Sequence, residues 1–191
     1  MNSGELRFLT SHEVATLIQV SPSAVLRWID QGRLRAFRTP GGHRRVASAE
    51  LVDFLRTHQM PVPRQLAPLR LLVIDDEARY LKALKVLLEP SFIEVELRDN
   101  PVDGLLAVGL RRPDVILLDV YMPGMDGAEV CRRLKASSET KDITVIAMSG
   151  SAAEDVVEEL RAAGAAAFLP KPLTAQAVLA ELAQLGLTRS P

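Results

Sequence analysis

The sequence has little cysteine and few aromatic residues: one Cys, one Trp and two Tyr stand among 191 residues. The single thiol, that of Cys131, cannot form an intrachain disulfide, so a reducing compartment is expected. No apolar run approaches the ~20 residues of a membrane span, and the N-terminal stretch has no apolar core of signal-peptide length. These absences predict a soluble, cytoplasmic protein without a membrane partner, and they exclude a disulfide-stapled secreted scaffold.

The sequence also lacks an excess of charge of either sign, because its net charge is −1. The distribution of that charge is nevertheless uneven. Residues 1–58 contain eight Arg, no Lys and five acidic residues, a local charge of +3, which leaves −4 on the remainder. A basic head on an acidic body indicates two modules with different partners.

A proline-rich segment, HQMPVPRQLAP at His58–Pro68, separates the two modules. It shows neither helical nor alternating periodicity, and each proline restricts its own backbone and that of the preceding residue. We therefore predict a first domain at residues 1–58, a semi-extended linker at 59–68 and a second domain at 69–187.

In the second domain, short apolar runs alternate with segments of helical periodicity. The strand-like runs are residues 69–75, 92–98, 114–119, 143–149 and 165–170. The helical segments are residues 78–89, 102–112, 128–136, 153–164 and 174–186. Strands that are apolar throughout and separated by single helices predict a parallel sheet covered on both faces. The expected fold class is therefore α/β, with a five-stranded parallel sheet in a (βα)5 order.

Polar residues close several of these strands. Asp75 and Asp76 end the first strand, Asp119 ends the third, Ser149 ends the fourth, and Lys171 follows the fifth. The carboxyl ends of parallel strands meet at one edge of a sheet, so these side chains should converge. A carboxylate at the end of a buried strand is costly to desolvate unless a charged group meets it. We therefore predict that Asp119 is a reaction site.

The chemistry of this group of residues suits phosphoryl transfer. Carboxylates gathered in one crevice repel one another, and a hard divalent cation such as Mg²⁺ relieves that repulsion. Asp119, between the acidic pair and Lys171, is then the natural nucleophile toward a phosphoryl group. Mg²⁺ and Lys171 would neutralise the charge on the transferred oxygens, and the Ser149 hydroxyl could donate to one of them.

Residues 69–187 resemble the receiver domain of two-component response regulators, which has the flavodoxin-like (βα)5 fold. The motifs VIDDE, LLDVYMPGMDG, MSG and AFLPKP carry the resemblance, in that order along the chain. It implies a histidine kinase as phosphodonor, Asp119 as phosphoacceptor, and no enzymatic activity beyond the domain's own phosphorylation and slow dephosphorylation. The implied metal ligands are Asp75, Asp76, Asp119 and the main-chain carbonyl of Tyr121. The implied phosphoryl-binding and switch residues are Ser149, Lys171 and Phe168.

Two positions bear on how long the phosphoryl group would last. Tyr121 and Ser151 stand two residues after Asp119 and Ser149, and both should face an attacking water. A bulky Tyr121 is expected to slow loss of the phosphoryl group. The same residue argues against a Mg²⁺-dependent hydrolase, because such phosphatases use an acid–base Asp two residues after the nucleophile.

The first domain begins with clear helix signals. Thr10 followed by Glu13 is a capping box, and Ser21 followed by Pro22 marks the start of a second helix. That helix should end at Gly32, so two short helices form a helix-turn-helix.

An arginine-rich segment, RLRAFRTPGGHRRV at residues 33–46, follows the second helix. Thr-Pro-Gly-Gly suits a hairpin tip, and the flanking arginines suit phosphate contacts or a minor-groove probe. Ser48 is expected to cap a third helix. Trp28 and Phe37 are expected in the core rather than stacked on bases.

The segment at about residues 6–57 resembles the MerR-like, excisionase-type winged helix-turn-helix domains. The phrase SPSAVLRWIDQGRLRAFRTPGGHRR carries the resemblance. It implies that the second helix enters the major groove of double-stranded DNA and that the wing contacts the backbone or minor groove. The implied DNA-contacting residues are Ser21, Ser23, Arg27, Arg38, His43, Arg44 and Arg45.

Together the two resemblances imply a transcription regulator whose DNA binding is controlled by phosphorylation through a receiver-mediated homodimer. The alternative is an adaptor under the same control, whose helix-turn-helix surface binds a protein instead of DNA.

Overall fold

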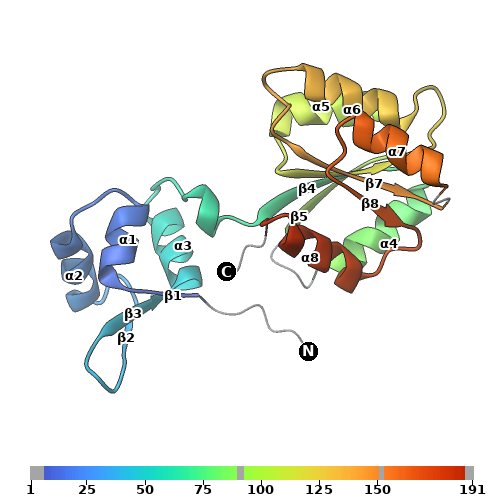
Figure 1. Cartoon of the computed structure of the whole chain (residues 1–191). Coiled ribbons are helices and arrows are strands. Elements are labelled where there is room, and N and C mark those ends of the chain that lie inside the picture. The colour runs from blue at the N-terminus through green and yellow to red at the C-terminus, as the bar shows by residue number, and fades with distance from the viewer. Residues whose placement is uncertain (1–6, 90–92, 151–152, 188–191) are drawn as a thin grey trace. The chain divides into compact units, whose positions relative to one another are not determined.

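The computed structural model describes residues 7–89, 93–150 and 153–187 of the chain. The chain divides between Pro68 and Leu69 into two compact units, coloured blue to teal and teal to red in Figure 1. The N-terminal unit has one hydrophobic core and the C-terminal unit has two, and each unit is described by itself. No helix within the described ranges is both long enough and apolar enough to cross a bilayer.

The N-terminal unit is a helix-turn-helix followed by a β-hairpin wing and a third helix (Figure 1). Its elements are β1 (Phe8–Leu9), α1 (Ser11–Leu17), α2 (Pro22–Asp30), β2 (Phe37–Arg38), β3 (Arg44–Ala47) and α3 (Ser48–Thr57). The three strands form an antiparallel sheet in the order β1-β3-β2. The predicted capping box at α1 is confirmed, because the Glu13 N–H donates to Thr10 Oγ1 at 3.1 Å and the Thr10 N–H donates to Glu13 Oε2 at 2.7 Å.

Three local features of this unit differ from the sequence-based expectations. Strand β1 was not expected, since two residues are too few to show an alternating pattern. Helix α3 starts at Ser48 itself, so Ala47 is the N-cap and no side chain caps the helix. Phe37 is not in the core: its side chain is 46% exposed and packs edge-on against Phe8, with ring centroids 5.0 Å apart. Phe37 lies on β2, a two-residue strand at the edge of the sheet, where a side chain stays largely open to solvent. Trp28 does pack against the core, as expected.

The proline-rich segment is less of a spacer than its composition suggests. It contains a 3₁₀ turn, η1 (Arg64–Leu66), and Leu66 is only 1% exposed. Met60 and Val62 pack against the same N-terminal core. The spacing of these apolar residues follows no period, because a turn rather than a helix or strand brings them inward. Only Ala67 and Pro68 separate the last buried side chain of this unit from the next strand.

The C-terminal unit is a five-stranded parallel sheet with helices on both faces, as the sequence predicts. Its elements are β4 (Leu69–Ile74), α4 (Ala78–Leu88), β5 (Ile93–Arg98), α5 (Pro101–Arg111), β6 (Val115–Asp119), α6 (Gly127–Ala136), β7 (Thr144–Ser149), α7 (Glu154–Ala162), β8 (Ala167–Pro170) and α8 (Ala175–Gln184). The strand order is β5-β4-β6-β7-β8, and all neighbouring strands are parallel. The order reverses beside β4, the first strand, which is the switch point at which such sheets form their crevice.

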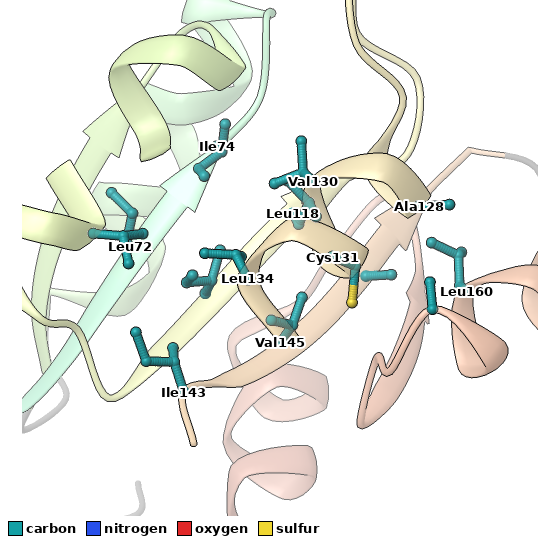
Figure 2. Close-up of a cluster of buried hydrophobic side chains, with 14 of the residues drawn as sticks. Leu72, Ile74, Leu118, Ala128, Val130, Cys131, Leu134, Ile143, Val145 and Leu160 are labelled. Carbon is teal, nitrogen blue, oxygen red and sulfur yellow. The ribbon is translucent and has the colours of Figure 1, made fainter. Parts of the chain in front are cut away.

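Helices α5, α6 and α7 cover one face of the sheet, and α4 and α8 cover the other (Figure 1). Figure 2 shows the core between the sheet and α5, α6 and α7. There, Cys131 and Leu134 of α6 lie over Leu118 of β6 and Val145 of β7. Every residue of β6 is buried, which explains its uninterrupted apolar run. Burial also raises the pKa of the Cys131 thiol, so this cysteine is a core residue and not a reactive one.

Candidate phosphoryl-transfer site and nucleic-acid face

The register of the parallel strands brings the polar strand ends together. Asp119 pairs with Met148 in register, so the next residue of β7, Ser149, lies just beyond it. The Lys171 N–H donates to the Ser149 carbonyl at 2.8 Å, which carries the chain from β8 toward the same edge. Residues from three separate strands therefore meet at the carboxyl edge, as the sequence predicts.

Three carboxylates gather at this edge. Asp75, Asp76 and Asp119 each offer a carboxylate oxygen, and these oxygens lie within 4.8 Å of one another. Asp75 and Asp119 are buried, whereas Asp76 is exposed. The Glu77 N–H donates to Asp75 Oδ1 at 2.9 Å, which fixes the orientation of the buried carboxylate.

Lys171 is the counter-charge of this cluster. Its Nζ lies 2.6 Å from Asp75 Oδ2 and 3.0 Å from Asp119 Oδ2, with the side chain 19% exposed. Apart from its ion pair with Lys171, Asp75 Oδ2 has no hydrogen-bond partner in the described part of the chain. The lysine lies close enough to bridge both buried acids.

The electrostatics of the site follow from burial and from these contacts. Burial raises the pKa of Asp119 above its usual value, although the hydrogen bond and charge of Lys171 act in the opposite direction. Burial lowers the pKa of Lys171, but its contacts with Asp75 and Asp119 outweigh this and raise the pKa overall. Asp119 is thus a carboxylate that is poorly solvated and still has a cation beside it, the environment of an activated nucleophile.

The donor set fits a hard divalent cation. All three acidic residues offer oxygen ligands, and a single lysine cannot balance three negative charges. Asp76 faces solvent and leaves the cluster open to ions and to a phosphodonor.

The loop after β6 packs closely against the end of that strand. The Gly127 N–H donates to the Val120 carbonyl at 2.8 Å, and a Cβ on Gly127 would lie 2.7 Å from the Asp119 carbonyl oxygen. Only glycine permits this approach, which accounts for the Gly at the end of the MPGMDG motif. Tyr121, two residues after Asp119, is 57% exposed. Ser151, expected to face the same water, lies outside the described residues.

Tyr80 belongs to the site although the sequence analysis did not find it. The Leu173 N–H donates to Tyr80 Oη at 3.1 Å, and Lys171 Nζ lies 4.7 Å from the centre of the Tyr80 ring. Tyr80 therefore holds the segment after β8 and gives the ammonium group an aromatic face. Its only sequence signal was a hydroxyl on the inward side of α4, beside the buried Leu81 and Leu84.

The two predicted switch residues occupy different environments. Ser149 is fully buried at the end of β7. Phe168 is half-buried and packs against the core formed by α5, α6 and α7. The switch roles of Ser149 and Phe168 stay predictions.

The predicted DNA-contacting residues of α2 lie on its first two turns. Ser21 caps the helix by accepting the Ala24 N–H at 3.3 Å, and its hydroxyl lies 3.0 Å from that of Ser23. Both serines and Arg27 are exposed. The N-terminal part of α2 thus presents hydroxyls, a guanidinium and the positive end of a helix dipole.

The wing divides its basic residues into two groups. Arg38 and His43 are exposed. Arg44, in contrast, is 20% exposed and pairs with Asp30 at the end of α2, while the Arg45 guanidinium donates to the Arg44 carbonyl at 3.1 Å. The Arg44–Asp30 pair ties the wing to the second helix, a relation that no local sequence signal revealed.

The parallel five-stranded sheet, with three carboxylates and a lysine at its carboxyl edge, is a flavodoxin-like α/β domain. The family described as the response regulator receiver domain matches residues 71–183, more than half of the chain, and a family described as a helix-turn-helix domain matches residues 8–59. The chain therefore belongs to the response regulator receiver family. Receiver domains bind Mg²⁺ through an acidic pocket, and Asp75, Asp76 and Asp119 form such a cluster here.

Individual relatives agree with this assignment. The chain is similar to the response regulator MprA of Mycobacterium sp. (strain KMS), with 36% identity over 124 residues that cover 65% of this chain and 53% of that protein. It is likewise 36% identical over 117 residues to MprA of Mycobacterium leprae (strain TN), covering 61% of this chain and 50% of the relative. The chain thus spans about half the length of these curated relatives.

Solved structures give the same fold. The signal receiver domain of a DNA-binding response regulator protein (merR) from Colwellia psychrerythraea 34H matches with a TM-score of 0.58 and 33% identity, covering 62% of this chain and 98% of that one. The chemotaxis protein CheY4 of Vibrio cholerae matches with a TM-score of 0.59 and 26% identity over the same shares. Both matches extend over nearly the whole of the solved chains.

Proposed function

We propose that this chain is a response regulator in which phosphorylation of Asp119 controls DNA binding by the N-terminal winged helix-turn-helix. The observation that carries the proposal is the position of Lys171 Nζ, 3.0 Å from one buried carboxylate and 2.6 Å from another. A receiver domain implies a histidine kinase as the phosphodonor.

In the proposed reaction, an Asp119 carboxylate oxygen attacks the phosphorus of a phosphohistidine or of a small phosphodonor such as acetyl phosphate. For phosphohistidine, a P–O bond forms while the P–N bond breaks, and the electron pair of that bond goes to the imidazole, which takes up a proton. Lys171 moves its hydrogen bond from the carboxylate to a phosphoryl oxygen. Asp75 keeps the lysine oriented throughout.

Asp75, Asp76, Asp119 and the main-chain carbonyl of Tyr121 would hold Mg²⁺. When bound, this ion neutralises charge on the phosphoryl oxygens. The exposed position of Asp76 keeps the entry open. We expect the exposed Tyr121 side chain to shield the acyl phosphate from water. Replacement of Tyr121 by Asn should therefore shorten the half-life of the phosphorylated protein.

The charge added at Asp119 has to change the surface of the receiver if phosphorylation is to control pairing. Phosphorylation adds about −1.5 to −2 units of charge by analogy with other phosphorylated side chains. The Ser149 hydroxyl would turn to donate to the phosphoryl group, and Phe168 would rotate inward to fill the vacated space. Such a change alters the surface formed by α7, β8 and α8, which we propose as the phosphorylation-dependent pairing surface.

The residues of the DNA face have two proposed roles: some contact DNA directly, and others also position the wing. Exposed Arg27, Arg38 and His43 are free to reach phosphates or base edges, together with Ser21 and Ser23. The last two proposed contact residues, Arg44 and Arg45, lie at the start of β3, directly after the turn of the wing, where the Arg44–Asp30 pair orients the wing against α2.

Magnitudes explain why pairing should matter. Three phosphate contacts give a salt slope near −2.7, so affinity falls roughly 40-fold between 50 and 200 mM salt. A non-specific affinity of about 10⁻⁴ to 10⁻⁶ M cannot select one operator among millions of sites. Two linked heads gain from effective concentrations in the millimolar range, on the order of 100-fold or more in affinity.

Two measurements test the proposal. Intact-protein mass spectrometry after incubation with Mg²⁺ and acetyl phosphate should show one added phosphoryl group, which is absent in Asp119→Ala. Operator affinity, obtained by genome-wide footprinting and then by titration, should rise with the phosphodonor for the wild type only. Equal operator affinity of Asp119→Ala and the phosphorylated wild type would contradict the proposed control.

The same preparation separates DNA binding from the protein-adaptor alternative. Random duplex should be retarded by the wild type and less so by Arg38→Ala or by the double variant Arg44→Ala/Arg45→Ala. Arg79→Ala, which removes an exposed arginine of the receiver, is the matched control. An absence of retardation at low salt would favour a protein partner for the helix-turn-helix surface.

A further inference from the structure

Helix α5 exposes a row of large apolar side chains on its outer face. Val102, Leu106 and Leu110 are 59%, 62% and 84% exposed. Residues four apart share a face of a helix, so these three side chains form one continuous line. In the described part of the receiver, the other large apolar side chains with comparable exposure, Val86 and Tyr121, occur singly on other elements.

The fold itself does not need this row. The opposite face of α5 already packs on the sheet through buried Gly104, Ala107 and Val108. A Cβ on Gly104 would lie 2.5 Å from Ile74 Cδ1, so α5 already lies close against β4 at this position. An apolar row that contributes nothing to the core of its own chain is typical of an interaction surface.

The charges beside the row are arranged by sign. Asp103, in the first turn of α5, accepts a hydrogen bond from Asn100 Nδ2 at 2.8 Å but makes no ion pair within the described ranges. Arg111, in the last turn, likewise has no acidic partner in residues 7–89, 93–150 and 153–187. With about 100° per residue, both side chains lie on the same side of the row.

We propose that this row pairs, antiparallel, with α5 of a second copy of this chain. A two-fold axis beside Leu106 places Val102 against Leu110 of the second copy. The same axis places Asp103 near Arg111 of the second copy, so two opposite-charge contacts form between four groups that have no such contact in the single chain. Gly109, whose Cβ position meets no atom within 4 Å, lets the two helices approach closely.

This pairing surface is distinct from the proposed phosphorylation-dependent one. Helix α5 lies over β4 and β5 at one edge of the sheet, whereas β8 is the strand at the opposite edge. Contacts through α5 therefore need no phosphoryl group and do not depend on the proposed function. One helix pair buries far less than the ~800 Å² per partner of a standard interface, so the association is weak in free solution.

Sedimentation of the full chain over a concentration series, without DNA or phosphodonor, tests the surface. The wild type should self-associate with a dissociation constant in the micromolar to millimolar range. Leu106→Glu and Leu110→Glu should each weaken association at least tenfold, because each change enters the two-fold contact twice. Val86→Glu is the matched control: its side chain is 68% exposed on α4, on the other face of the sheet, and it should change nothing.

Charge exchange tests the antiparallel geometry. Asp103→Arg alone and Arg111→Asp alone should each weaken association severalfold, since each homodimer then faces like charges. An equimolar mixture of the two variants should associate as well as the wild type, because the mixed pair regains both opposite-charge contacts. A wild type that stays monomeric at millimolar concentration, or a mixture no stronger than its components, would overturn the proposal.

Discussion

The two working surfaces of this chain place their charges in opposite surroundings. The receiver holds Asp75 and Asp119 inside the protein, with one lysine between them. The N-terminal unit carries Arg27 and Arg38 in solvent. Buried charges interact strongly because little water screens them, whereas exposed charges act weakly and additively. A single substitution in the receiver site should therefore have a large effect on stability or phosphorylation. A single substitution on the DNA face should have a small effect on DNA affinity.

The largest expected effect comes from removing the cation of the receiver. Lys171→Met leaves two buried carboxylates without a cationic partner and should lower the free energy of unfolding by about 3 kcal/mol at pH 7, the lower end for a broken buried pair. The loss should shrink as the pH falls and Asp119, whose pKa is raised by burial, takes up a proton. Urea denaturation measures it, and Lys82→Met, on the exposed face of α4, is the control that should stay near the wild type.

Mg²⁺ should act on the same charges from outside. At a concentration 100 times its dissociation constant, Mg²⁺ should stabilise the wild type by about 2.7 kcal/mol, seen as a higher melting temperature. Asp119→Asn should lose most of that gain.

Because burial raises the pKa of Asp119, its stabilising contribution is present at acid pH and lost as the pH rises through the folded-state pKa. Metal-free Asp119→Asn should therefore melt above the metal-free wild type at pH 7, and a lower value would contradict this charge balance.

A smaller effect is expected at Tyr80, where the receiver uses a neutral group. Tyr80→Phe removes the acceptor of the Leu173 N–H but keeps the ring beside Lys171, and should cost about 1 kcal/mol. Phosphorylation by acetyl phosphate should slow severalfold, because the segment that carries Lys171 is held less firmly. Tyr121→Phe, at an exposed ring, should leave stability unchanged. A Tyr80→Leu variant that is phosphorylated no more slowly than Tyr80→Phe would remove the role of the ring.

The smallest stability changes belong to the DNA face. Asp30→Asn breaks a partly exposed pair with Arg44 and should alter the free energy of unfolding by less than about 1 kcal/mol. Arg38→Ala should not change stability at all, yet should reduce the salt slope of DNA binding by about one. Titration of duplex at several salt concentrations measures the slope. A loss of all binding on one arginine substitution would show that this face is as cooperative as the receiver.

The same contrast explains how far the sequence could predict the molecule. In the receiver, the strand ends that carry Asp75, Asp119 and Lys171 are fixed by the topology of a parallel sheet, so their convergence followed from the order of the elements. Tyr80 could not be found in this way, because its role depends on a hydrogen bond to Leu173 across 93 residues.

In the N-terminal unit, helix signals such as the capping box at Thr10 were sufficient because they are local. The exposure of Phe37 and the pairing of Arg44 with Asp30 were not predictable, since both depend on how a short hairpin rests on a small core. Local rules also failed for the proline-rich segment, whose Leu66 is buried without any period.

The burial of Leu66 has a consequence for the reach of each DNA-binding head. With Leu66 fixed in one core and Leu69 in the first strand of the other, the tether between the units is two residues, Ala67 and Pro68. Fully stretched, it spans roughly 10 Å. If receivers pair as proposed, this short tether limits how far apart the two DNA-binding heads can reach. Operators should therefore tolerate little variation in the number of base pairs between their half-sites.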